Sequence, residues 1–229
     1  ILPERLIRGA FVNMQPQAYK LLISTNNRII MNKKEQIKLW LAEMRAPFLI
    51  LAVLLVSIGL AFGWKYHPEG TTFNPWHAVL LMIGVVSSHI SVNLFNEYSD
   101  NKTRIDHNTN RTPFSGGSGV LSSGKLSPAS VLRVGILTLV GSFAIGIYFA
   151  ITIHWIIFVL AGLGAFSILF YTNVLAKFQL GELFSGLTLG TFVVLGSYVV
   201  MTGHPGMSVG ELFPTDVLLM SIPPGILTA

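Results

Sequence analysis

A group of polar side chains at the end of a hydrophobic segment has the composition of a metal site. Asn96, Glu97 and Asp100 follow Asn93 by three, four and seven residues, so a helix would carry all four on one face. Carboxylates at a membrane boundary are costly unless something binds them, and Mg²⁺ takes a few protein oxygens together with water and phosphate. These residues predict a magnesium site; the alternative is a set of solvated side chains at a helix end.

The residues that follow could bind the phosphate. Lys102 and Arg111 are positively charged, and Arg111 precedes a Gly- and Ser-rich turn that includes Ser115, Gly116 and Gly117. Arginine, hydroxyl groups and backbone N–H groups are the usual partners of a phosphate. The turn lacks the strand and the lysine of a P-loop. We therefore expect a phosphate-bearing ligand beside the metal.

The composition places these residues in a membrane protein. Of the 229 residues, 52% are hydrophobic and 11% are charged, whereas about 25% are charged in soluble domains. The sequence has no cysteine, which excludes disulfides and thiolate metal sites. The basic residues gather at helix ends and no nucleic-acid-binding module is present, so we expect a lipid bilayer and no nucleic acid as partner.

Hydrophobic runs of nearly the length that crosses a bilayer recur along the chain. A short polar break at Thr152 and His154 separates the third run from the fourth, which predicts a tight helical hairpin. We predict an all-α polytopic transmembrane bundle, because a lipid-exposed backbone must satisfy its own hydrogen bonds. The expected spans are 47–64, 75–98, 129–150, 151–171, 183–201 and a sixth from 213 onward.

The basic residues are distributed unevenly between the two sides of this bundle. From Met31 onward, Lys65 is the one Lys or Arg expected on the side where odd-numbered spans exit. The positive-inside rule then predicts a cytoplasmic N-terminus and a cytoplasmic loop between the second and third spans. The basic residues expected on the cytoplasmic side are Lys33, Lys34, Lys38, Arg45, Lys102, Arg104, Arg111, Lys125, Arg133 and Lys177.

The sequences near the two ends of the chain suggest the domain boundaries. Met31 opens a basic, amphipathic lead-in to the first span, so residues 1–30 are interpreted as upstream or non-native sequence. The sixth span is still apolar at Ala229. We therefore expect residues 31–229 to be one membrane domain that lacks its C-terminal part.

The spacing Asn96-x3-Asp100-x5-Asp106 resembles the first Asp-rich motif of the UbiA-type membrane prenyltransferases. It is most similar to the branch that prenylates 1,4-dihydroxy-2-naphthoate in menaquinone synthesis. Glu97 stands where Asp is commoner in that motif. The resemblance covers about residues 36–229, and its further supporting segments are Arg45-Ala46-Pro47, Arg111 to Gly119, Tyr171-Thr172 and Gly181-Glu182-Leu183-Phe184.

The resemblance implies a nine-helix bundle that transfers a polyprenyl group from its diphosphate to an aromatic quinone precursor, with Mg²⁺ as cofactor. Asn96 and Asp100 would hold Mg²⁺ on the diphosphate, with the help of Asp106, and Arg111 would neutralise phosphate oxygens. The family has a second Asp-rich motif after the sixth span, so this chain alone is expected to be inactive. Residues expected to contact substrate are Asn93, Glu97, Lys102, Ser115, Gly116, Gly117, Tyr171 and Glu182, of which Glu182 could equally be a helix cap.

A transporter or channel that binds a cation through the acidic cluster is the alternative function. Two features argue against it. The acidic residues gather at one mouth of the bundle rather than near the bilayer midplane, and Arg111 with its Gly-Ser turn has no role in cation binding.

Overall fold

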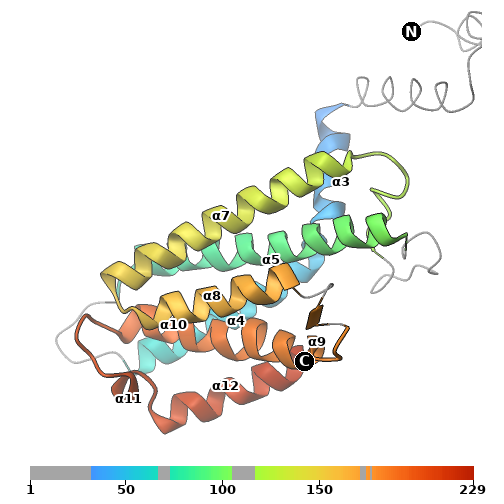
Figure 1. The fold of residues 1–229 in the computed structure, drawn as a ribbon. Coiled ribbons are helices and arrows are strands. Elements are labelled where there is room, and N and C mark those ends of the chain that lie inside the picture. The colour runs from blue at the N-terminus through green and yellow to red at the C-terminus, as the bar shows by residue number, and fades with distance from the viewer. Residues whose placement is uncertain (1–31, 67–72, 105–116, 171–173, 176) are drawn as a thin grey trace, which may run out of the picture.

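The computed structural model describes residues 32–66, 73–104, 117–170, 174–175 and 177–229. All regular elements within these residues are helical, and they pack as a bundle (Figure 1), which confirms the predicted all-α class. In chain order they are α3 (Lys33–Glu43), η1 (Ala46–Phe48), α4 (Leu49–Lys65), α5 (Pro75–Thr103), α7 (Pro128–Thr152), α8 (Ile156–Phe170), α9 (Gly181–Ser185), the π-helix η3 (Gly186–Thr191), α10 (Phe192–Thr202), α11 (Val209–Leu212) and α12 (Thr215–Thr228).

Four helical stretches are long and apolar enough to cross a membrane: Ala46–Lys65, Pro75–Thr103, Pro128–Thr152 and Gly181–Thr202. The other two expected spans correspond to the shorter apolar helices Ile156–Phe170 and Thr215–Thr228. At 1.5 Å per residue, a 15-residue helix such as α8 extends about 22 Å, less than the roughly 30 Å of a hydrocarbon core. The described part of the chain is an integral membrane bundle with four full-length spans.

The break predicted between the third and fourth spans is confirmed, because α7 ends at Thr152 and α8 begins at Ile156. His154 in this turn is buried. Its Nδ1 accepts a hydrogen bond from the Ile156 N–H at 3.2 Å, so its Nε2 carries the hydrogen that is donated to the Met207 carbonyl at 2.9 Å. The ring thus caps α8 and ties the hairpin to the segment after α10.

Helices α5 and α7 pack against each other along much of their length, and both begin at a side-chain cap followed by proline. Asn74 caps α5 and Ser127 caps α7, which satisfies backbone N–H groups that have no partner within the helix. The buried Ser91 hydroxyl donates to the Gly135 carbonyl at 3.0 Å across the interface. A Cβ at Gly135 would lie 3.4 Å from that of Leu94, which is ordinary van der Waals contact.

The apolar core divides into two clusters. The larger one joins α4, α5, α7, α8, α10 and α12, and includes Val56, Leu195 and Val199. The smaller one consists of Leu94, Leu121 and Val131, with Trp40 and Met44 of α3 packed against it. Helix α3 runs across the ends of α5 and α7 rather than along them (Figure 1). The smaller cluster therefore fixes the end of the bundle that carries the polar residues.

Candidate active site at the end of helix α5

Helix α5 continues to Thr103 and ends at Arg104, whose φ of 62° is in the left-handed region. The expectation that Asn93, Asn96, Glu97 and Asp100 share a helical stripe is therefore met. The four side chains nevertheless have different surroundings. Asn93 and Glu97 are 7% and 3% exposed, whereas Asn96 and Asp100 are half-buried. We call Asn93 and Glu97 the inner pair of this stripe, and Asn96 and Asp100 the outer pair.

Glu97 contacts the Gly-Ser turn. The Ser118 N–H donates to the Oε1 and Oε2 atoms of Glu97 at 2.8 and 3.0 Å, and the Ser118 hydroxyl lies 2.9 Å from Oε2. The same hydroxyl lies 2.6 Å from Oε2 of Glu43, at the end of α3. Glu43 is completely buried. One serine thus joins two buried carboxyl groups from different helices.

Asn93 also contacts α3, since its Nδ2 donates to the Met44 carbonyl at 2.9 Å. Met44 is the C-cap of α3, where backbone carbonyls have no partner within the helix. The Asn93 amide satisfies one of them. This contact and the Glu43–Ser118 contact lie next to each other in the chain, so α3 is attached to α5 at two points.

Asn96, one member of the outer pair, lies beside a cavity. A space of about 410 Å³ between the ends of α5, α7 and α8 is lined by Asn96 and by the exposed Lys102. One polar amide residue and one basic residue thus line a cavity whose wall is otherwise partly aromatic and aliphatic. The other lining residues are Phe95, Tyr98, Ser99, Thr103, Leu132, Ile168 and Leu169.

The donor chemistry of the outer pair fits magnesium. Asn96 and Asp100 are four residues apart on α5, so their oxygens lie on neighbouring turns of one face. Mg²⁺ commonly takes one or two protein oxygens and completes its six ligands with water and substrate phosphates. Among the described residues no group of three or more His, Cys, Asp and Glu could hold a metal alone. Asn96 and Asp100 would therefore leave most positions around a bound Mg²⁺ to water and phosphate.

Several expected site residues lie outside the described part of the chain: Asp106, Arg111, Ser115, Gly116 and Tyr171. Gly117 is described, and its φ of 71° is a conformation that glycine adopts without steric cost. Glu182 is exposed in the first turn of α9 and makes no capping hydrogen bond there. These positions remain predictions from the sequence.

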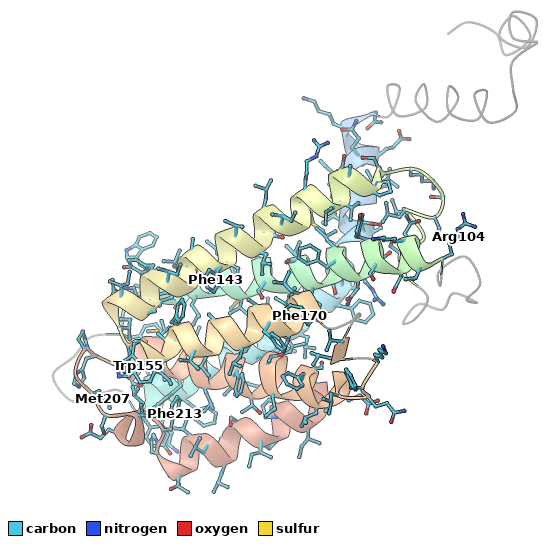
Figure 2. All side chains as sticks on the ribbon, in the orientation of Figure 1. Arg104, Phe143, Trp155, Phe170, Met207 and Phe213 are labelled. Carbon is cyan, nitrogen blue, oxygen red and sulfur yellow. The ribbon has the colours of Figure 1, made fainter. Side chains whose placement is uncertain are left out.

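A second, mainly apolar cavity of about 150 Å³ lies deeper among α5, α7, α8, η3 and α10. Phe143 of α7, labelled in Figure 2, is part of its wall together with Phe192 of α10. Small residues such as Gly164 and Gly196 leave the space open. The bundle thus contains an apolar space in addition to the polar cavity.

Sequence reasoning missed Glu43 and treated Ser118 only as part of an anion-binding turn. The sequence did contain a signal for Glu43, because it is one of two acidic residues in an otherwise basic lead-in to the first span. For Ser118 the signal was its position between Gly117 and Gly119, which both have positive φ. Such flanking glycines let a turn present a side chain and its own N–H toward one partner.

Comparisons with known proteins give a family match and a curated relative. The model of the UbiA prenyltransferase family matches residues 52–229. A 1,4-dihydroxy-2-naphthoate octaprenyltransferase from Haemophilus influenzae is 30% identical over 135 residues, which cover 58% of this chain and 42% of that relative. No solved structure matches the chain. The family match extends over most of the sequence and includes all four membrane-crossing helices in whole or in large part, so this chain belongs to the UbiA prenyltransferase family.

Proposed function

We propose that this protein transfers a polyprenyl group from polyprenyl diphosphate to an aromatic quinone precursor, with Mg²⁺ as cofactor and 1,4-dihydroxy-2-naphthoate as acceptor. The observation that carries the proposal is the outer pair near the end of α5: Asn96 lines a cavity that Lys102 also lines, and Asp100 follows Asn96 by about one helical turn. Family membership supports the reaction type, and the name of the Haemophilus influenzae relative supports the acceptor.

In this mechanism the polar end of α5 binds the diphosphate. Asn96 and Asp100 supply oxygen ligands, with Asp106 as a third ligand. Lys102 and Arg111 neutralise the non-bridging phosphate oxygens, and Arg111 can contact two of them at once. Bound Mg²⁺ would supply positive charge where negative charge develops on the departing pyrophosphate.

The interior of the bundle protects the reacting carbon. As the allylic C–O bond breaks, the electron pair leaves with pyrophosphate and the prenyl carbon becomes positively charged. An electron-rich ring carbon of the acceptor then forms the new C–C bond, and the ring loses a proton. Water would capture the same cation, so the apolar lining around Phe143 and Phe192 favours transfer over hydrolysis.

The substrate contacts assigned from the sequence remain part of this proposal. Ser115, Gly116 and Gly117 would donate backbone or hydroxyl hydrogens to the diphosphate. Tyr171 and Glu182 would face the acceptor. Glu182 suits an acceptor contact because its carboxylate is exposed at the start of α9 and could accept a hydrogen bond from a phenolic hydroxyl.

The direct test is an assay of the full-length gene product in lipid vesicles. Labelled octaprenyl diphosphate and 1,4-dihydroxy-2-naphthoate should give a prenylated naphthoquinol precursor and pyrophosphate. Chelation of divalent cations should stop the reaction and added Mg²⁺ should restore it. A monocyclic hydroxybenzoate serves as the control acceptor. Cation flux across the vesicle membrane without any prenyl transfer would contradict the proposal and favour a transporter.

A further inference from the structure

We propose that Glu43, Glu97 and Ser118, here called the Ser118 cluster, form a positioning device that holds the C-terminal end of α5 in place. The cluster would orient Asn96 and Asp100 without contacting the ligand that they bind. The inference rests on the proposed function only for the identity of that ligand. It assigns Glu97 a positioning role in place of the substrate contact expected from its sequence motif.

The first argument is that Ser118 contacts carboxyl groups from two helices. Its N–H is shared between the two oxygens of Glu97, and its hydroxyl, which has one hydrogen, lies within hydrogen-bonding distance of Glu97 and of Glu43. Burial strengthens such hydrogen bonds because the local dielectric constant is low. Ser118 therefore connects α3 to α5. In the sequence it lies 75 residues after Glu43 and 21 residues after Glu97.

The second argument is the backbone around Ser118. Gly117 and Gly119 have φ values of 71° and 76°. This conformation costs residues with a Cβ about 1 kcal/mol or more, and it bends the chain sharply on both sides of Ser118. The Val120 N–H then donates to the Ser118 hydroxyl oxygen at 3.1 Å. Leu121 follows and packs into the smaller apolar cluster, so the turn is anchored to the bundle core.

The third argument is that the cluster and Asn93 together define the rotation of α5. Asn93 is bonded to Met44, and Glu97 is linked to Glu43 through Ser118, so two consecutive turns of α5 are attached to α3. Successive residues of a helix are 100° apart, and the helix is rigid over one turn. Holding Asn93 and Glu97 therefore fixes the directions in which Asn96 and Asp100 point.

The fourth argument separates Glu97 from the ligands. Both of its oxygens accept hydrogen bonds from Ser118, and its side chain is 3% exposed, whereas Asn96 and Asp100 are half-buried. Residues that hold metal ligands in position are important for affinity even when they do not touch the metal. Their substitution typically weakens metal binding or activity about ten- to hundredfold.

The test compares Ser118→Ala with Ser91→Ala, which removes a buried hydroxyl hydrogen bond from the same helix closer to its middle. In full-length protein, Ser118→Ala should weaken the binding of Mg²⁺ with inorganic pyrophosphate about tenfold or more. Ser91→Ala should lower the unfolding temperature and change this binding less than twofold. Equal effects of the two substitutions on binding would overturn the proposal.

A second series tests the role of Glu97. Glu97→Gln keeps the length of the side chain and an oxygen that accepts from Ser118, whereas Glu97→Asp keeps the charge but is one methylene too short. The positioning role predicts that Gln retains more binding of Mg²⁺ with pyrophosphate than Asp does. A metal ligand would show the opposite order, and that order would contradict the proposal.

The mobility of a spin label on α5 tests the positioning role independently of prenyl-transfer activity. The chain has no cysteine, so Asn101→Cys allows a single nitroxide label on the last turn of α5. Ser118→Ala should make the spectrum of this label more mobile, and Ser91→Ala should not. If the label responds but the protein transfers no prenyl group, the proposed function fails and the positioning role stands. An unchanged spectrum in Ser118→Ala overturns the positioning role, whatever the activity.

Discussion

At the scale of single residues, four neighbouring polar side chains on α5 have two kinds of surroundings. Asn93 and Glu97 contact the end of α3 and the Gly-Ser turn, whereas Asn96 and Asp100 remain half-buried. The buried Glu97 carboxyl group is tolerated because the Ser118 N–H donates to it, and because the Ser118 hydroxyl, which also contacts Glu43, lies 2.9 Å from it. We propose that the half-buried Asp100 carboxylate binds a cation.

Asp100→Ala should abolish prenyl transfer by the full-length protein and weaken its binding of Mg²⁺. The physical reason is that alanine removes the charged oxygen that we propose as a Mg²⁺ ligand. Asp100 is half-buried and lies outside both apolar clusters. Membrane insertion and the unfolding temperature should stay close to those of the unsubstituted protein. Turnover near the normal rate in purified Asp100→Ala would remove this residue from the mechanism.

Arg111→Lys should be poorly tolerated even though the charge is kept. Lysine lacks the planar group that donates two parallel hydrogen bonds to phosphate oxygens. We expect a higher KM for the prenyl diphosphate and an unchanged KM for the aromatic acceptor, measured by steady-state kinetics. If both values stay the same, Arg111 would be a charge that orients the loop in the membrane and not a substrate contact.

At the scale of secondary structure elements, the junction of η3 with α12 depends on the absence of side chains. Gly186 and Gly190 of the π-helix face Gly225 of α12, and a Cβ on Gly190 would lie 2.5 Å from the Pro224 carbonyl oxygen. The Ser185 hydroxyl adds a hydrogen bond to the Thr228 carbonyl at 2.8 Å. Small residues allow this close backbone approach, which helices in membranes use in place of hydrophobic burial.

Gly190→Ala should destabilise the protein by about 1–3 kcal/mol, because the added methyl group has no space beside α12. Gly162→Ala in α8 is the matched control, since a Cβ there meets no atom within 4 Å. It should be neutral, or stabilise by up to about 1 kcal/mol through helix propensity. Unfolding in detergent, followed by circular dichroism, measures both. Equal stability of the two variants would contradict the close packing of η3 and α12.

At the scale of the whole molecule, the two ends of the bundle differ in chemistry. Arg104 lies at the same end as α3, whereas Trp155, Met207 and Phe213 lie at the other end (Figure 2). Exposed Trp64, Trp76 and Trp155 side chains are typical of the interface between membrane and water. This difference between the two ends matches the positive-inside pattern of the sequence. It predicts that the end with α3 faces the cytoplasm.

Single cysteines can test this orientation, because residues 1–229 contain none. Ser123→Cys lies in the exposed turn before α7, and His204→Cys lies in the exposed segment after α10. In intact cells or right-side-out vesicles, a membrane-impermeant thiol reagent should label position 204 and not position 123. After permeabilisation both should react. Labelling of position 123 alone in intact cells would reverse the proposed topology.

The sequence by itself determined the membrane class, the helical segments and the end of the bundle that carries the polar residues. These features are local: hydrophobic length sets a span, Asn74 and Ser127 cap the helices that follow them, and the stripe from Asn93 to Asp100 depends only on helical periodicity. Family resemblance was also readable from the Asn96 to Asp106 spacing, and the family match over residues 52–229 confirms it.

Only the tertiary structure decided which members of that stripe point inward, and what they meet. The contacts of Glu97 with Ser118, of Ser118 with Glu43 and of Asn93 with Met44 join residues 21 to 75 positions apart. Periodicity could not anticipate them, since they depend on the direction in which α3 crosses α5 and on two glycines with positive φ. The close fit of η3 to α12 also depends on tertiary structure, because the space available beside a helix is set by the elements that pack against it.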